Sequence, residues 1–160
     1  MFSKIERTTY LPGERPLMVF DGNCGFCKYW VIRWKKISGL EVDYKPYQKV
    51  AKNFKDISEQ HFKEAVRYID LEGNVFTGPD AAYITYFNKN KVKFLHLWYI
   101  EKTWFRNLSD FAYQFIADHR DTMSKITIRL FGKNPANPKP YWKYYLLGLI
   151  VLIVSLSILM

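Results

Sequence analysis

The chain holds two cysteines, and their spacing can carry redox chemistry. Cys24 and Cys27 are separated by two residues, and Asp21 lies three positions before the first of them. Two intervening residues on a helical turn bring the sulfur atoms within bridging distance, so the pair can alternate between a dithiol and a disulfide. The sequence therefore predicts thiol–disulfide exchange at Cys24 and Cys27.

The flanking residues predict the elements that position this pair. Residues 17–20 are apolar and predict a buried strand, and residues 21–23 predict a turn. Asn23 can cap a helix over residues 24–38, in which Cys24 lies in the first turn and Cys27 faces inward. Exposed N–H groups and the helix dipole favour a thiolate at that end. We therefore expect Cys24 to be the nucleophile and Cys27 to resolve the mixed disulfide.

Other uses of the two cysteines are a structural disulfide, half of a zinc site, or two unrelated thiols. A zinc site needs four ligands. His61, His96 and His119 are isolated and have no suitable spacing to one another. We therefore expect no metal and no cofactor apart from the redox-active disulfide. Trp30 and Trp34 are expected on the buried face of the helix rather than in a cofactor site.

Asp21 has two candidate roles. As a turn residue it would accept hydrogen bonds from the N–H groups of Gly22 or Asn23. As a carboxylate near the sulfurs it could take the proton of Cys27 during resolution. Its negative charge would raise the pKa of the Cys24 thiol, whereas the helix dipole would lower it, so the sequence does not determine the direction of the net pKa shift.

The C-terminal residues predict a membrane anchor. Residues 144–160 carry no charge, are mostly Leu, Ile and Val, and follow the aromatic pair Tyr141-Trp142. Such a stretch is just long enough to cross the ~30 Å hydrocarbon layer as one transmembrane helix. A buried core helix is the alternative.

Basic residues precede this stretch and predict its orientation. The 160-residue chain has a formal net charge of +9, and no acidic residue follows Asp121. The basic flank comprises Lys125, Arg129, Lys133, Lys139 and Lys143. Basic residues beside a span mark its cytoplasmic side, so the catalytic residues should face the cytoplasm, where a cycling pair is more useful than a structural disulfide. Because the basic excess is concentrated there, we do not expect nucleic-acid binding.

The remaining patterns predict an α/β fold. Residues 40–44 predict a second strand, parallel to the first across the helix. Residues 65–70 and 75–77 predict an antiparallel hairpin, followed by a helix from Pro79 to Asn88. This is a thioredoxin-like βαβ plus ββα core. Short helices are expected within residues 49–63, and C-terminal helices over residues 91–104, 107–121 and 123–131.

The motif containing Asp21, Cys24 and Cys27 resembles the DxxCxxC signature of the DCC family, also called DUF393. The resemblance covers residues 16–132 and extends to Gly78-Pro79-Asp80-Ala81 and to Tyr113, Ala117 and Arg120. It implies a thioredoxin-like thiol–disulfide oxidoreductase. The predicted organisation is an N-terminal extension (1–15), this domain (16–132), a basic Pro-rich linker (133–143) and the transmembrane helix (144–160).

The substrate groove is less defined by the sequence. Thioredoxins and glutaredoxins place a cis-proline before the hairpin, but residues 63–65 contain no proline. The substrate contacts that we predict are Gly25, Phe26, Thr77, Gly78, Pro79 and Asp80. The expected substrate is a disulfide or thiol, either of a protein or glutathione-like. The alternatives are a non-catalytic, membrane-tethered thioredoxin-like adaptor and a redox or metal sensor.

Overall fold

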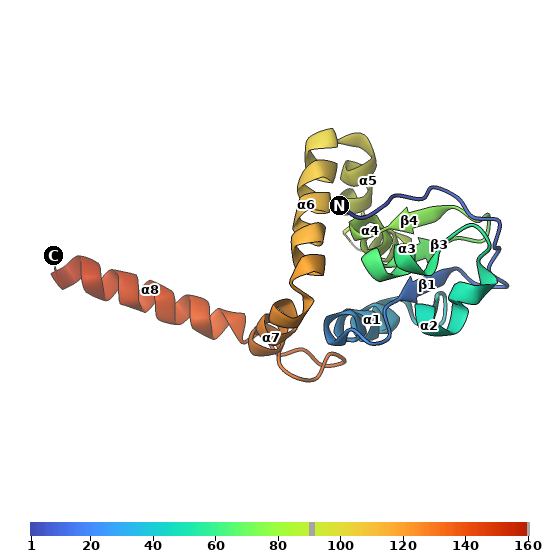
Figure 1. The fold of residues 1–160 in the computed structure, drawn as a ribbon. Helices are drawn as coiled ribbons and strands as arrows, with labels where there is room; N and C mark the ends of the chain where they lie inside the picture. The colour runs from blue at the N-terminus through green and yellow to red at the C-terminus, as the bar shows by residue number, and fades with distance from the viewer. Residues whose placement is uncertain (90–91, 160) are drawn as a thin grey trace.

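The computed structural model describes residues 1–89 and 92–159, and it has a mixed α/β fold (Figure 1). Its elements are, in chain order, β1 (Leu17–Phe20), α1 (Gly25–Ser38), β2 (Asp43–Pro46), α2 (Tyr47–Val50), the 3₁₀ helix η1 (Ala51–Asn53), α3 (Glu59–Glu64), β3 (Arg67–Ile69), β4 (Val75–Thr77), α4 (Pro79–Asn88), α5 (Phe94–Glu101), α6 (Thr103–Asp118), α7 (Arg120–Phe131) and α8 (Trp142–Leu159).

One four-stranded sheet has the strand order β2-β1-β3-β4. β1 pairs with β2 in parallel, whereas β3 pairs antiparallel with both β1 and β4. The predicted parallel pair and hairpin are thus confirmed. The predicted position of the second strand is wrong by several residues: Gly39 has φ +60°, Leu40 is 84% exposed, and the chain enters the sheet only at Asp43. Here the turn after α1, rather than the apolar pattern, determines where β2 begins.

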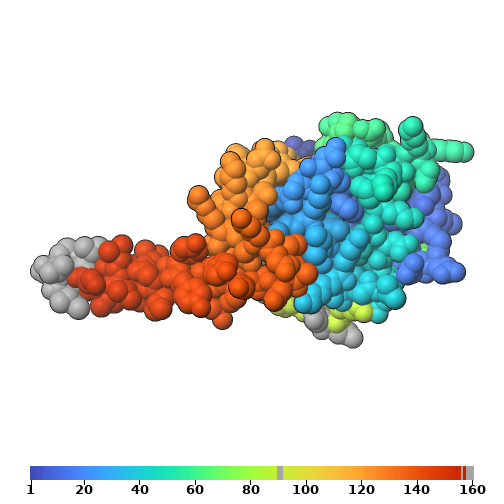
Figure 2. Space-filling model, turned by 90° about the horizontal axis from the view of Figure 1, so that it is seen from below, coloured from blue at the N-terminus to red at the C-terminus, as the bar shows by residue number. Residues whose placement is uncertain are grey.

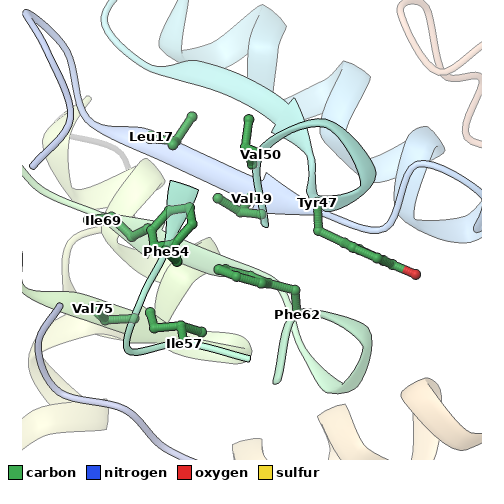
Figure 3. Close-up of a cluster of buried hydrophobic side chains, with 9 residues drawn as sticks. All are labelled: Leu17, Val19, Tyr47, Val50, Phe54, Ile57, Phe62, Ile69 and Val75. Carbon is green, nitrogen blue, oxygen red and sulfur yellow. The ribbon is translucent and has the colours of Figure 1, made fainter. Parts of the chain in front are cut away.

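The two faces of the sheet each carry a buried apolar cluster, because side chains alternate along β1. Leu17 and Val19 point to one face, whose cluster is shown in Figure 3 and also contains Tyr47, Val50, Phe54, Ile57, Phe62, Ile69 and Val75. Met18 and Phe20 point to the other face, where they pack with Val31, Trp34, Val42, Tyr68, Ala81 and Ile84. The two faces thus lie against different helices, α2 and α3 on one side and α1 and α4 on the other.

Two carboxylates are among the groups that hold the N-terminal segment, residues 1–15, against the core. Glu64 accepts a hydrogen bond from the Ser3 N–H at 3.0 Å. Asp56 accepts from the Thr9 N–H at 2.6 Å and from the Thr8 hydroxyl at 2.8 Å. These contacts lower the pKa of both carboxyl groups: the Ser3 N–H is the main cause at Glu64, and the Thr9 N–H at Asp56.

Acid should loosen this segment. Because the folded-state pKa values of Asp56 and Glu64 lie below their unfolded values, the two contacts stabilise the fold fully above about pH 4 and are lost as the pH falls through the folded pKa values. We expect the amides of Ser3 and Thr9 to lose hydrogen-exchange protection between pH 6 and pH 3, after correction for intrinsic rates. In the double variant Asp56→Asn, Glu64→Gln the loss should already be present at pH 6. Equal protection of the native protein at both pH values would contradict this prediction.

Arg67 in β3 is fully buried, at 0% exposure, and joins three segments. Its guanidinium donates to the carbonyl of His61 through Nε and Nη2, at 3.2 and 3.0 Å. It also donates to the Ser3 carbonyl at 3.0 Å and to the Thr77 hydroxyl at 2.8 Å. Burial lowers the pKa of Arg67 to about 10. The side chain thus ties α3, the N-terminal segment and β4 together.

The last helix, α8, bears on the predicted membrane anchor. It extends away from the rest of the chain (Figures 1 and 2), and its described side chains are exposed. Residues 144–160 are predicted to span a membrane, but among the described residues no helix combines the length and apolar character that a span requires. α8 has 18 residues and begins with Trp142, Lys143 and two tyrosines.

Candidate redox site

The cysteine pair lies where β1 passes into α1. The two residues form a disulfide with their Cα atoms 5.2 Å apart. Cys24 itself caps the helix: its backbone is extended, and its Sγ accepts a hydrogen bond from the Cys27 N–H at 3.0 Å. The prediction of Asn23 as the cap is therefore wrong by one position, because the Asn23 N–H is donated back to Asp21 and α1 begins only at Gly25.

The two sulfur-bearing residues face different surroundings, although both are half-buried. Cys24 lines an open groove together with Asn23, Gly25 and residues 117–122. Cys27 lines a separate, mainly apolar cavity of about 50 Å³. The other residues around that cavity are Phe20, Asp21, Phe26, Trp30, Val31, Trp34, Phe62, Ala65, Val66, Tyr113, Ile116, Ala117 and Arg120. Of the pair, Cys24 is thus the residue that lines the open groove.

Asp21 borders both the groove and the cavity, and its carboxylate is engaged by three donors. Oδ1 accepts from the Asn23 N–H at 2.9 Å and from the Gln48 amide at 2.8 Å. Oδ2 lies 3.5 Å from Arg120 Nη1. Gln48 also accepts from the Gly22 N–H at 3.1 Å. The turn role predicted for Asp21 is present, and Gln48 and Arg120 complete it.

Arg120, the first residue of α7, is a site residue that sequence reasoning noted only through the family resemblance. Besides Asp21, its guanidinium donates to the carbonyls of Lys63 and Glu64 at 2.8 and 2.9 Å. These residues belong to the segment where the cis-proline is missing, and no cis peptide bond occurs in the described part of the chain. Arg120 therefore joins the turn before the cysteines to the segment before β3.

Tyr113 of α6 acts on the same segment. Its hydroxyl accepts a hydrogen bond from the Val66 N–H at 3.0 Å, and burial raises its pKa. Tyr113 and Arg120 lie seven positions apart, which is two helical turns. Such a spacing predicts that both residues lie on one face of a single helix. In the structure α6 ends at Asp118 and Arg120 belongs to α7, so this pattern alone could not place both residues at the cysteines.

The predicted substrate contacts divide into two groups. Gly25 lines the groove with Cys24, and Phe26 lines the cavity with Cys27. Residues 77–80 border neither space. Thr77 is buried and accepts from Arg67, Gly78 lies under the rings of Phe2 and Tyr113, and Asp80 is hydrogen-bonded to His96 at 2.7 Å. The structure thus brings only the first group to the cysteines.

Within the described residues, no three or more Cys, His, Asp or Glu side chains converge as metal ligands would.

Comparison with known protein families gives a match to this chain. The sequence model of a family described as DCC1-like thiol-disulfide oxidoreductase matches residues 18–125, which is more than half of the chain. No curated protein and no solved structure is a significant match.

Proposed function

The chain belongs to the DCC1-like thiol-disulfide oxidoreductase family, and we propose that it exchanges electrons with disulfide substrates through Cys24 as nucleophile and Cys27 as resolving cysteine. The observation that carries this assignment is the position of Cys24, which caps α1 and lines the open groove while Cys27 lines the inner cavity. A substrate that enters the groove therefore meets Cys24 first.

The exchange needs only the two cysteines. In the reduced protein, the Cys24 thiolate attacks one sulfur of the substrate disulfide, forms a mixed disulfide and releases the first substrate thiolate. The Cys27 thiolate then attacks Cys24 Sγ, which releases the second substrate thiolate and forms the Cys24–Cys27 disulfide. Two electrons pass to the substrate, and an external dithiol must return them. Chemistry of this kind uses no bound cofactor.

In the proposed exchange reaction, Asp21 and Arg120 support the two cysteines. The carboxylate of Asp21 fixes the turn that presents Cys24. It also borders the cavity that Cys27 lines, so it can receive the proton of the Cys27 thiol. The guanidinium of Arg120 offsets the charge of Asp21, so the carboxylate opposes thiolate formation less than an isolated one would.

We further propose that residues 16–132 form a thioredoxin-like domain. The support is the βαβ unit, the antiparallel hairpin and the following helix α4, which match the layout predicted from the sequence. Residues 1–15 would then be an extension packed on this domain, and residues 133–143 a linker. The predicted cytoplasmic placement of the cysteines is untested and stays a prediction.

The function is tested by mixing the prereduced full chain, freed of reductant, with 2-hydroxyethyl disulfide. We expect the protein dithiol to be oxidised faster than dithiothreitol at the same thiol concentration. A rate no greater than that of dithiothreitol would overturn the proposal. That outcome would favour the alternative of a non-catalytic adaptor.

Cys27→Ser should accumulate the mixed disulfide. The variant keeps the attacking thiolate but has no group to resolve the intermediate, so substrate should remain attached to Cys24. Intact-mass spectrometry should show one added 2-mercaptoethanol moiety per chain, and dithiothreitol should remove it. The reduced native protein, which resolves the same intermediate, is the control. A Cys27→Ser protein without the adduct would assign the attacking role to the other cysteine.

A further inference from the structure

One face of α6 carries large apolar side chains that no part of the described chain covers. Trp104, Leu108, Phe111 and Phe115 follow one another at spacings of four, three and four residues, so they share one helix face. The opposite face is the buried one and holds Ser109 and Asp110. The structure of the chain alone thus leaves this face in water.

The same surface continues onto α5, which lies beside α6 (Figure 1). The ring of Trp98 lies 6.2 Å from that of Trp104, and the ring of Phe94 lies 5.3 Å from that of Trp98. We call the six residues Phe94, Trp98, Trp104, Leu108, Phe111 and Phe115 the aromatic stripe. Their exposed fractions range from 41% to 69%.

The other end of the stripe reaches the redox site. The His119 ring lies 4.5 Å from that of Phe115, and its Nδ1 lies 2.8 Å from the Phe115 carbonyl oxygen. His119 also lines the groove that contains Cys24. A macromolecule whose disulfide enters this groove therefore lies beside the C-terminal end of α6 and meets the stripe.

The size and charge of this surface specify the partner. At the exposures above, the stripe offers on the order of 700 Å² of apolar surface, close to the ~800 Å² that each partner buries in a standard protein interface. The groove next to it is lined by three carboxylates, Asp21, Asp118 and Asp121, against one guanidinium, Arg120. In a chain of net charge +9, this local acidity favours a basic residue next to the substrate cysteine.

We propose that the aromatic stripe docks a protein substrate of the Cys24–Cys27 pair, an amphipathic helix whose apolar face covers the stripe and whose disulfide-bonded cysteine, flanked by basic residues, reaches Cys24. The inference rests on the proposed function. The substrate disulfide is reduced to two thiols, and the Cys24–Cys27 dithiol supplies both electrons and both protons as it becomes the disulfide.

The test compares two peptide disulfides with one small disulfide. The helical peptide has about 20 residues, with leucines at the 4-3-4 spacing of the stripe, lysines elsewhere, and a terminal cysteine linked to 2-mercaptoethanol. The second peptide has the same composition in scrambled order, and 2-hydroxyethyl disulfide reports the chemistry alone. Prereduced full chain should react with the helical peptide at least about tenfold faster than with the scrambled one.

The double variant Trp104→Gln, Phe111→Gln should lose this preference and retain its rate with 2-hydroxyethyl disulfide. Leu40→Gln, which changes an exposed leucine in the turn after α1, should keep both. Failure with the small disulfide would remove the proposed function and the docking role together. An unchanged small-disulfide rate without a stripe-dependent preference would overturn the docking role alone. The docking role would also be overturned if the double variant kept the preference for the helical peptide but lost dimerisation or lost binding to phosphatidylglycerol vesicles. Either result would assign the stripe to a second copy of the chain or to a membrane surface.

Discussion

Replacing Cys24 with serine should abolish disulfide exchange. A serine hydroxyl is not ionised near neutral pH and does not attack a disulfide, so the rate with 2-hydroxyethyl disulfide should fall at least about a thousandfold. The remaining Cys27 lines the inner cavity rather than the groove, so it should not substitute for Cys24. The measurement is the loss of protein thiol after mixing prereduced protein with excess disulfide.

Cys27→Ser is the matched control for this result. Both variants lose the disulfide, so any change in stability that follows from that loss is common to them. They should nevertheless differ in chemistry, because Cys27→Ser retains the first attack and Cys24→Ser does not. A Cys24→Ser protein that reacted as fast as Cys27→Ser would show that the groove does not select the attacking sulfur.

Replacing Arg67 with alanine should cause the largest loss of stability among the substitutions considered. The change leaves the carbonyls of His61 and Ser3 and the hydroxyl of Thr77 without their buried donor and opens a cavity beside β3. The expected loss is about 3 kcal/mol of unfolding free energy, or roughly 6 to 12 °C in melting temperature. Urea and thermal unfolding of the full chain, followed by circular dichroism, measure it.

Two further arginine substitutions define what that loss means. Arg67→Lys keeps the positive charge but cannot reach all three acceptors, so its stability should be intermediate. Arg15→Ala removes an exposed ion pair with Asp43 and should cost less than about 1 kcal/mol. A melting temperature of Arg67→Ala equal to that of Arg15→Ala would contradict the structural role of Arg67.

Local patterns predicted the elements that hold the cysteines. The apolar run before Asp21, the helical spacing after Cys24 and the Pro79 start of α4 each depend on residues that are neighbours in the chain, so the strand, α1 and α4 could be predicted. The start of β2 and the cap of α1 lie at other residues than predicted, because turn geometry decides both. That geometry depends on the backbone angles of Gly39 and Cys24, which are set by the folded structure around them.

The surroundings of the site could not be predicted in this way. Asp21 and Arg120 are 99 positions apart, and Ser3 and Arg67 are 64 apart. No periodicity or spacing rule connects residues at such distances. The sequence pointed to Arg120 only through the family resemblance, and the contacts of the N-terminal segment came only from the tertiary structure. The substrate contacts predicted at residues 77–80 depended on the same kind of long-range placement, and the structure sets them apart from the groove.

The contact between Asp21 and Arg120 also bears on how the protein is made. At a synthesis rate of 5 to 20 residues per second, the ribosome releases Arg120 roughly 5 to 20 s after Asp21, given the 99 positions between them. During that interval the nascent chain carries both thiols before α7 exists to border them. Cys24 and Cys27 are therefore most accessible during translation, before the finished fold restricts access to them. In that period they can react with oxidants and with thiols of other nascent chains.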